Sequence, residues 1–354
     1  MALQEYECPA CGGAMEFNPH TQKLKCPFCD SEFDVKDYVA NHNSSSQGEV
    51  ADESAQDAAS NPTSETMYVY SCGSCGGEIL ATESLGSTKC PFCNNNIVVK
   101  EKFTGEFKPD YIIPFQKTKD DAIATYTNYV KTKKLVPKVF LEKNHIDEIK
   151  GVYVPFWLFN AKESFSGEYE ATKVRTWSDA TYNYREIKYY NVSRAGTESF
   201  ERVPVDGSKE MPDDLMESLE PFDHSKMVPF NMGYLAGFFA NKYNVEAKEC
   251  QPHALNRMDV TTAADFRGTI SGYSSIRTIH ENCGTVDSSY KYALYPVYLL
   301  STTWNNKSFI FAMNGQNGKF IGNLPFSLKQ ALKYYIPITL GVAVAAFIFM
   351  YFAC

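Results

Sequence analysis

Positive charge and histidine are both scarce in this sequence of 354 residues. Lysine and arginine number 34 against 42 aspartates and glutamates, which gives a net charge of −8, and the six histidines stand singly along the chain. Proteins that bind nucleic acids through their phosphates concentrate lysine and arginine on one face. The composition therefore argues against a nucleic-acid partner. The chain also lacks the H-E-x-x-H motif of a helical zinc protease site.

The motifs of other common catalytic sites are missing as well. The chain contains neither G-x-x-x-x-G-K-[ST], which binds nucleotide phosphates, nor G-x-S-x-G, which presents a nucleophilic serine. Cys250 and Cys283 are isolated thiols, and an isolated cysteine in a core is more often a small buried residue than a nucleophile. We therefore assign no catalytic residue and expect a protein that is not an enzyme.

Cysteine itself is abundant, and eight of the 11 cysteines form a repeat. Two C-x-x-C pairs separated by 14 residues occur twice, at a constant offset of 64, and the second pair reads C-P-F-C both times. Such a repeat indicates an internal duplication of a small domain. The first copy contains Cys8, Cys11, Cys26 and Cys29, and the second contains Cys72, Cys75, Cys90 and Cys93.

Paired C-x-x-C motifs at this spacing are typical of a zinc ribbon, in which each pair offers two thiolates to a tetrahedral ion. We therefore expect two zinc ions per chain, one in each copy. Rubredoxin-like domains hold iron with a similar ligand set, so iron stays open as the alternative metal. Zinc is favoured because nothing near the cysteines indicates a redox partner, and because small domains commonly use zinc to fold.

The sequence between the two copies has a different composition. Residues 1–39 and 67–102 form the predicted ribbons, whereas residues 40–66 contain no lysine, arginine or aromatic residue and read as a disordered acidic linker. Such a tether would let the two ribbons adopt independent orientations. Residues 1–38 contain seven acidic side chains and three lysines, and four thiolates around a zinc ion add about two negative charges, so the first ribbon is a poor partner for phosphate.

Residues 103–325 are predicted to form one α+β domain. Thr118 and Asp121 form a capping box before a helix of about four turns, and the C-terminal part reads as a β-meander. The 14 mostly apolar residues 227–240 are too few to span a bilayer, so we predict a helix of the soluble core. The other predicted elements are strands at 152–159, 182–203, 290–304, 308–313 and 319–321, and a short helix at 212–219.

The C-terminal segment, residues 334–354, contains 21 residues without a charge. An α-helix of this length covers about 30 Å, the thickness of the hydrocarbon core of a bilayer, so the segment is predicted to be a transmembrane helix. Lys329 and Lys333 lie in the preceding juxtamembrane segment, 326–333. The positive-inside tendency then predicts a single-pass tail anchor in the cell membrane, with the N-terminal domains in the cytoplasm.

The two ribbons, the apolar C-terminal segment and the stretches "YIIPF", "GVYVPFWLF" and "FAMNGQNGKFIGNLP" resemble a Gram-positive family of membrane-anchored double-zinc-ribbon proteins. Members are often labelled as TFIIB-type zinc-ribbon proteins or as the primosomal replication-restart helicase. The resemblance implies a role in envelope stress, with a phage-shock protein A homologue and an SPFH/flotillin-like protein as partners held at the membrane.

These observations predict a membrane-tethered adaptor or scaffold that recruits cytoplasmic proteins. Two alternatives stay open: a zinc-ribbon protein that binds nucleic acid without motor activity, and a rubredoxin-like iron redox protein. The acidic charge separates the first alternative from the adaptor, and the identity of the metal separates the second.

Overall fold

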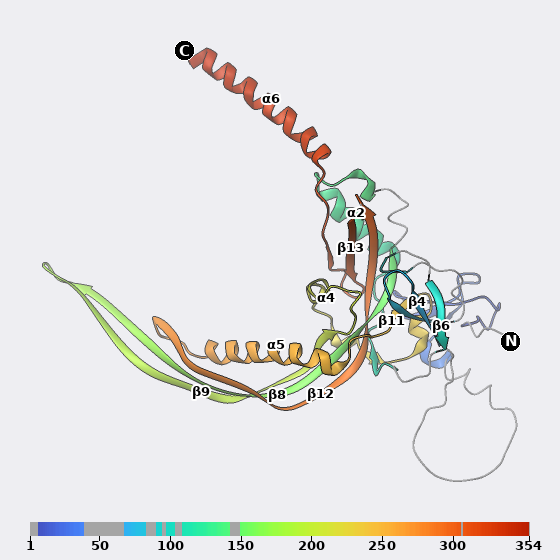
Figure 1. The fold of residues 1–354 in the computed structure, drawn as a ribbon, viewed down its shortest axis with the longest axis horizontal. Helices are drawn as coiled ribbons and strands as arrows, with labels where there is room; N and C mark the ends of the chain where they lie inside the picture. The colour runs from blue at the N-terminus through green and yellow to red at the C-terminus, as the bar shows by residue number, and fades with distance from the viewer. Residues whose placement is uncertain are drawn as a thin grey trace, which may run out of the picture.

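The computed structural model describes residues 6–38, 67–82, 90–93, 97–102, 108–141, 149–305 and 307–353. Most strands belong to one 11-stranded sheet with the order β10-β7-β12-β8-β11-β5-β4-β6, to which β9, β13 and β14 are added at the sides. Figure 1 shows a central body from which a long curved arm and the C-terminal helix both project. The middle of the chain therefore mixes helices and strands, as predicted. The predicted linker, residues 40–66, lies outside the described residues.

The first ribbon is a small three-stranded sheet that packs on the body. It consists of β1 (Glu16–Asn18), β2 (Lys23–Lys25) and β3 (Glu32–Phe33). The N–H of Phe17 donates to the carbonyl of Ala236 at 3.0 Å, and the Phe17 ring meets the Tyr234 ring edge to face at 5.2 Å. Leu24 is fully buried in the cluster that also contains the core of the middle domain. The first ribbon therefore shares a hydrophobic core with the rest of the protein.

The second ribbon is joined to the body through backbone pairing. It contains β4 (Met67–Cys72), β5 (Glu78–Thr82) and β6 (Ile97–Lys102). Strand β5 pairs antiparallel with β11 (Phe239–Asn241), which in turn pairs parallel with β8 (Lys150–Ser178). The ribbon sheet is thus continuous with the central sheet. The expectation of freely oriented ribbons is not met, because both ribbons have fixed positions on the same body.

The predicted capping box before the first long helix is present. Helix α2 (Lys119–Thr132) begins after Thr118, whose hydroxyl accepts from the N–H of Asp121 while the Asp121 carboxylate accepts from the N–H of Thr118. The reciprocal bonds satisfy two backbone donors that a helix start leaves without partners. Tyr126 and Val130 are buried on the inner face of α2, which fixes the helix against the sheet.

The curved arm was only partly predicted. Three long antiparallel strands form it: β8, β9 (Asn183–Asp206) and β12 (Ser275–Trp304). Helix α5 (Ala247–Gly268) lies along the inner, concave side of the arm (Figure 1). The predicted strands at 152–159 and 290–304 lie within β8 and β12, and the one at 182–203 lies within β9 except for Tyr182, which precedes it. Neither α5 nor the outer halves of β8 and β12 were expected.

The prediction of a core helix at 227–240 is wrong. The segment contains β10 (Val228–Pro229), the 3-10 turn η3 (Met232–Leu235) and the start of β11. Pro229 cannot donate a helical hydrogen bond, and Gly237 has a φ of +82°, which interrupts a helix. Tyr234, Leu235 and Ala240 are buried, and most of the other apolar side chains are half-buried, where the segment crosses the sheet under the first ribbon.

The remaining short elements complete the body, and the predicted helix at 212–219 and the C-terminal meander are confirmed. The remaining elements are β7 (Tyr111–Ile112), η1 (Lys138–Leu141), α4 (Asp213–Leu219), η2 (His224–Lys226), β13 (Lys307–Asn314) and β14 (Phe320–Gly322). Strand β13 pairs antiparallel with both β12 and β14, which forms the meander.

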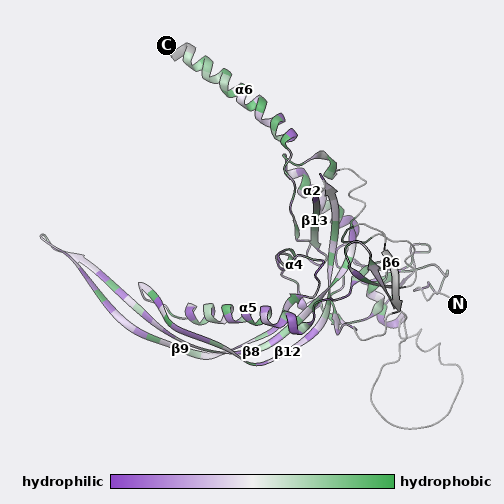
Figure 2. Ribbon diagram, in the orientation of Figure 1, coloured by the Kyte–Doolittle hydropathy of each residue, from purple (hydrophilic) through white to green (hydrophobic). Residues whose placement is uncertain are grey.

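The C-terminal helix α6 (Leu328–Ala353) stands away from the body (Figure 1). Its stretch Leu328–Met350 is long and apolar enough to cross a bilayer, and no part of its most apolar window is buried. Figure 2 shows hydrophobic residues along most of this helix and hydrophilic ones at its base. The helix begins at Leu328, six residues earlier than predicted. The carbonyl of Ser327 accepts from the N–H of Ala331 at 2.9 Å and so forms the first hydrogen bond of the helix.

A buried acid between the arm and α5 supports a test of this packing. Glu163 is fully buried; one carboxylate oxygen accepts from the Thr285 hydroxyl at 3.0 Å, and the other has no hydrogen-bond partner among the described residues. Burial, opposed by the Thr285 hydrogen bond and assisted by the nearby charge of Asp259, raises the pKa of Glu163. Folding therefore favours the protonated acid, so this contribution to wild-type stability should rise as the pH falls through the raised pKa toward the ordinary pKa of glutamate.

We expect Glu163→Gln to increase the free energy of unfolding at neutral pH by about 1 kcal/mol, because it removes a buried charge and keeps the acceptor for Thr285. Chemical denaturation of the full chain in detergent at mildly acidic and mildly alkaline pH measures the effect. The increase in the free energy of unfolding of Glu163→Gln over the wild type should be larger at alkaline pH, where the wild-type carboxylate is charged. An equal gain at both pH values would show that Glu163 does not titrate in that interval.

Candidate metal centres

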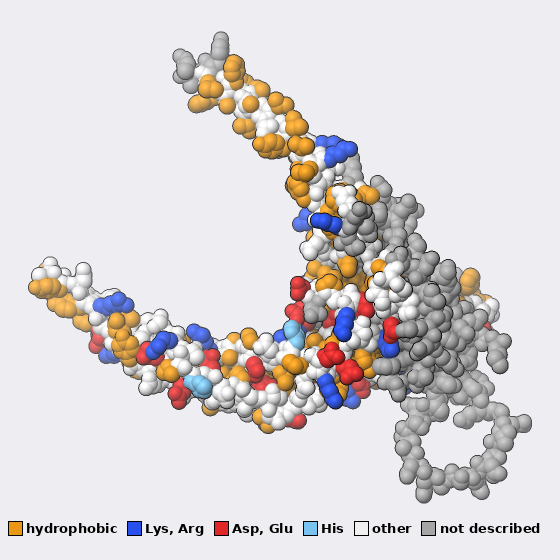
Figure 3. Space-filling view, in the orientation of Figure 1, with side chains coloured by type: hydrophobic (Ala, Val, Ile, Leu, Met, Phe, Trp, Pro, Cys, Tyr) orange, Lys and Arg blue, Asp and Glu red, His pale blue; other side chains and the backbone are white. Residues whose placement is uncertain are grey.

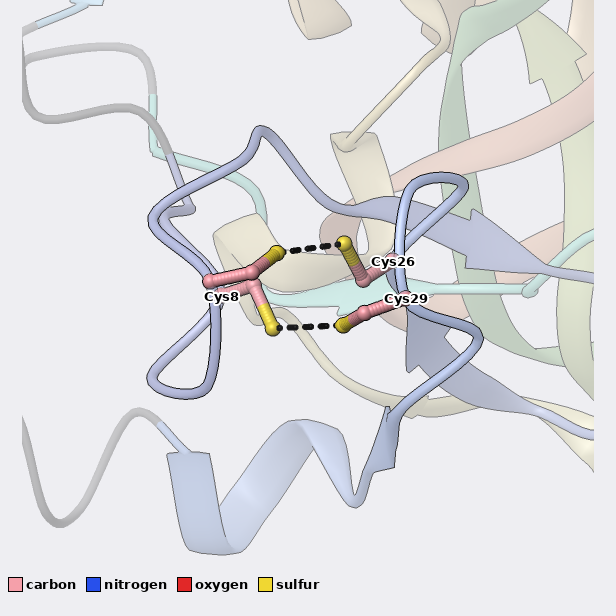
Figure 4. A group of neighbouring side chains, drawn as sticks. Cys8, Cys26 and Cys29 are labelled. Atoms are coloured by element: carbon pink, nitrogen blue, oxygen red, sulfur yellow. Dashed lines mark hydrogen bonds between the residues drawn. The ribbon is translucent and has the colours of Figure 1, made fainter.

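The structure brings together the four cysteines of the first ribbon. Their sulfur atoms all lie within 4.8 Å of one another. Cys8 Sγ is 3.4 Å from Cys29 Sγ, and Cys11 Sγ is 3.5 Å from Cys26 Sγ. Figure 4 shows Cys8 facing Cys26 and Cys29 across the gap between the two knuckles. A zinc ion with Zn–S bonds of about 2.3 Å separates its sulfur ligands by about 3.8 Å, so the cluster is close to the size that a tetrahedral ion requires.

The second ribbon repeats this arrangement. Cys72 Sγ is 3.4 Å from Cys93 Sγ and Cys75 Sγ is 3.7 Å from Cys90 Sγ, and again all four sulfurs lie within 4.8 Å of one another. Separations of this size exclude disulfide bonds, which need about 2.05 Å between sulfurs. The two predicted ligand sets are therefore two groups of free thiols, each of which could hold a metal ion.

The backbone of each first knuckle explains the glycines that follow it. The N–H of Gly12 donates to the carbonyl of Cys8 at 2.8 Å, and the N–H of Gly76 donates to the carbonyl of Cys72 at 2.9 Å. These glycines have φ values of +72° and +78°, a conformation that other residues adopt only with strain. The tight turn places both thiols of a pair on the same side of the loop.

The electrostatics of the thiols favour a bound cation. Hydrogen bonds from the Ser31 hydroxyl and backbone N–H lower the pKa of Cys29 to about 6. Burial, in contrast, raises the pKa of Cys90 to about 11 and also raises that of Cys75. A group of four thiols in such close contact cannot all ionise without a positive charge between them. A divalent ion supplies that charge and displaces the protons, so metal binding should weaken as the pH falls.

The two clusters differ in what surrounds them. Phe28 in the first C-P-F-C loop is 75% exposed, whereas Phe92 at the matching position is 7% exposed and packs in the core. Lys150 Nζ also lies 3.5 Å from the carbonyl of Cys90, so a positive charge is near the second cluster. The second cluster is therefore built into the body, and the first presents its C-P-F-C loop to solvent.

Cys250 and Cys283 are not arranged as nucleophiles. Cys250 Sγ donates to the carbonyl of Asp206 at 3.4 Å, and Cys283 Sγ donates to the carbonyl of Asp259 at 3.6 Å. Burial raises the pKa of Cys283, with further contributions from nearby carboxylates. A thiol that donates to a carbonyl is held in its neutral form, which is the weaker nucleophile.

The chain is similar over nearly its whole length to a protein of Bacillus subtilis (strain 168). The two sequences are 28% identical over 344 residues, which cover 96% of this chain and 95% of the relative. The relative is described as uncharacterized protein YdjG, a description that assigns no activity. No family model matches the chain. No solved structure matches it either.

Proposed function

We propose that the protein is a non-catalytic adaptor that is tethered to the cell membrane and recruits cytoplasmic proteins to it through its zinc ribbons. The observation that carries this proposal is the separation of two features of the structure. One is α6, an apolar helix whose most apolar stretch is not covered by the rest of the protein. The other is the exposed C-P-F-C loop of the first ribbon. Location and recognition can therefore be supplied by different parts of the chain.

Helix α6 acts in this proposal as a single-pass anchor. Lys329 and Lys333 lie in its first two turns, and Figure 3 shows basic side chains at its base and hydrophobic side chains along its length. Basic residues flanking an apolar helix favour the cytoplasmic side. The ribbons and the middle domain are then cytoplasmic, where thiols stay reduced and available to a metal.

Zinc is the proposed metal in both clusters. Four thiolates in a tetrahedral arrangement suit zinc, and a closed set of four protein ligands leaves no open position for chemistry. Iron in the same ligand set would make the protein a redox carrier. Nucleic acid is a poor partner for the first ribbon, because acidic residues outnumber lysines in it and the thiolates add negative charge.

The proposed partners follow from the resemblance to membrane-anchored double-zinc-ribbon proteins. They are a phage-shock protein A homologue and an SPFH/flotillin-like protein, and the proposed setting is the response to envelope stress. Phe28 is the residue of the first ribbon best placed to contact such a partner, because exposed aromatic side chains contribute strongly to protein interfaces.

Capture of a partner from native membranes tests the proposal. We expect Phe28→Ala to weaken co-purification of the main partner at least about tenfold, as removal of an aromatic contact at an interface commonly does. The measurement is quantitative identification of proteins that purify with the full chain after detergent solubilisation. Phe326→Ala is the matched control, since Phe326 is 56% exposed but lies beside α6. Equal recovery with both variants would remove Phe28 from the recognition surface.

A further inference from the structure

The end of the arm extends beyond the helix that covers it. Strands β8 and β9 join through a turn at residues 179–182. Closer to the body, Phe165 of β8 stacks on Phe266 of α5 with ring centroids 4.6 Å apart, and Tyr169 and Ala171 are fully buried. Side chains alternate along a strand, so the odd-numbered residues of β8 face α5. Beyond Ala171 the same concave face continues without the helix.

This uncovered face carries aromatic and basic side chains in contact with one another. Trp177 stacks on Tyr184 with centroids 5.4 Å apart and an interplanar angle of 12°, and Arg175 lies 5.4 Å from the Trp177 ring. Lys173 lies 5.6 Å from the ring of Tyr190 and 5.2 Å from that of Tyr273, which follows α5 and covers the inner end of this face. Trp177 is 46% exposed. We call this the tip surface, and its residues are Lys173, Arg175, Trp177, Tyr184, Glu186, Lys188 and Tyr190.

The tip surface has the opposite charge balance to the whole chain. Residues 172–190 contain four basic and two acidic side chains, whereas the chain carries a net charge of −8. One of the acids, Asp179, is used within the turn, where it accepts from the N–H groups of Thr181 and Tyr182, both at 2.8 Å. Lys173 and Lys188 are directly opposite each other in the strand register. Like charges in that arrangement destabilise a sheet. The other acid, Glu186, lies on the same face opposite Arg175, and its carboxylate is 3.5 Å from Lys188 Nζ, so it offsets part of this repulsion. The face therefore carries three basic side chains against one acidic side chain.

We propose that the tip surface is a second membrane contact, which lies in the headgroup layer of anionic phospholipid. Tryptophan and tyrosine are enriched at this depth because their rings are apolar and their N–H or O–H groups stay hydrated, and basic side chains are attracted to anionic headgroups. The arm and α6 leave the body toward the same side, and the concave side of the arm faces the space beside α6 (Figure 1). The inference rests on the proposed anchoring through α6, since the anchor holds the arm near the bilayer.

Fluorescence of Trp177 in the full chain tests the contact. The protein is placed in nanodiscs of phosphatidylglycerol and phosphatidylcholine, with brominated acyl chains as the quencher, and the signal of Trp177→Phe is subtracted to isolate Trp177. We expect a blue-shifted Trp177 emission that is quenched by the brominated lipid and shielded from aqueous iodide. In nanodiscs of phosphatidylcholine alone the quenching by brominated lipid should be weaker. Each basic side chain near the bilayer increases binding to an anionic surface over a neutral one roughly fivefold.

The double variant Lys173→Glu, Lys188→Glu should lose the preference for anionic lipid. It replaces one like-charged pair with another and removes the ion pair between Lys188 and Glu186, which is exposed and contributes little to stability. The control Lys23→Glu, Lys248→Glu reverses two exposed charges outside the tip surface and should behave as the wild type. Retention of the chain in the nanodiscs during gel filtration reports separately on α6. If iodide still quenches Trp177 in chains that remain in the nanodiscs, the proposal is overturned and the tip surface is better explained by a protein partner. A chain that does not remain in the nanodiscs would instead contradict the proposed anchoring through α6.

Discussion

The Cys26→Ser variant is expected to bind one metal ion per chain where the wild type binds two, and to lose the fold of the first ribbon. Cys26 is fully buried and belongs to the cluster that joins the ribbon to the middle domain. A structural zinc contributes about 10–16 kcal/mol to the folding of a small domain, so loss of one thiolate removes most of that stabilisation. Phe17 and Leu24 then lose their buried environment, and the body should become less stable by about 3 kcal/mol or more.

Elemental analysis of the purified protein and limited proteolysis measure the two effects. The control is Cys283→Ser, which removes a thiol outside both clusters and should retain two ions. Protease cleavage should appear within residues 6–38 of the Cys26→Ser variant and not in the control. A wild-type protein that is red and contains iron would contradict the zinc assignment and favour the redox alternative. Full metal content in Cys26→Ser would contradict the ligand set itself.

Removal of residues 334–354 is expected to transfer the protein from the membrane fraction to the soluble fraction. The nine Leu, Ile, Val and Phe residues of this segment favour insertion by about 3–5 kcal/mol, a partition of about 150-fold or more. Sedimentation of cell membranes after alkaline washing measures the transfer. The matched control is a chain in which a poly-leucine segment of the same length replaces residues 334–354, and this chain should again sediment with the membranes. A truncated protein that still sediments with membranes would show that another part of the chain holds it there.

The metal centres could be predicted from the sequence because their ligands are fixed by local spacing. Each C-x-x-C pair closes a tight turn of a few residues, and the repeat of both pairs identifies the residues without knowledge of the fold. The same holds for α2, where Thr118 and Asp121 satisfy helix-start donors within four residues of chain. Local hydrogen bonds of this kind leave a direct pattern in the sequence.

The arm could not be predicted because it buries little. Its strands are covered on one face only, by α5, which would normally give a clear alternation of apolar and polar residues. The alternation is weak in the outer half of β8 because the covered positions include Glu163 and Gly167. Helix α5 also has a weak pattern, since its buried residues are mainly small. They are Ala247, Cys250, Ala254, Met258 and Thr262. A stripe of small side chains packs closely on a sheet and produces little hydrophobic periodicity.

The docking of the ribbons was missed for a different reason. Contacts such as Phe17 on Tyr234, or Ala240 opposite Leu80 in the register of β11 and β5, join segments that are far apart in the chain. Spacing within a motif carries no information about these partners. The segment 227–240 was misassigned for the same reason, because it is apolar through its burial beneath the first ribbon and not through helical packing.

The location of a captured partner tests the adaptor account most directly. Fluorescent fusions of the protein and of its main co-purifying partner are imaged in cells that express the full chain, the chain without residues 334–354, or the full chain with Phe28→Ala. The account predicts that the partner is at the membrane with the full chain, follows the truncated chain into the cytosol, and is cytosolic with Phe28→Ala while the protein itself stays at the membrane. A partner that remains at the membrane in all three strains would contradict the account.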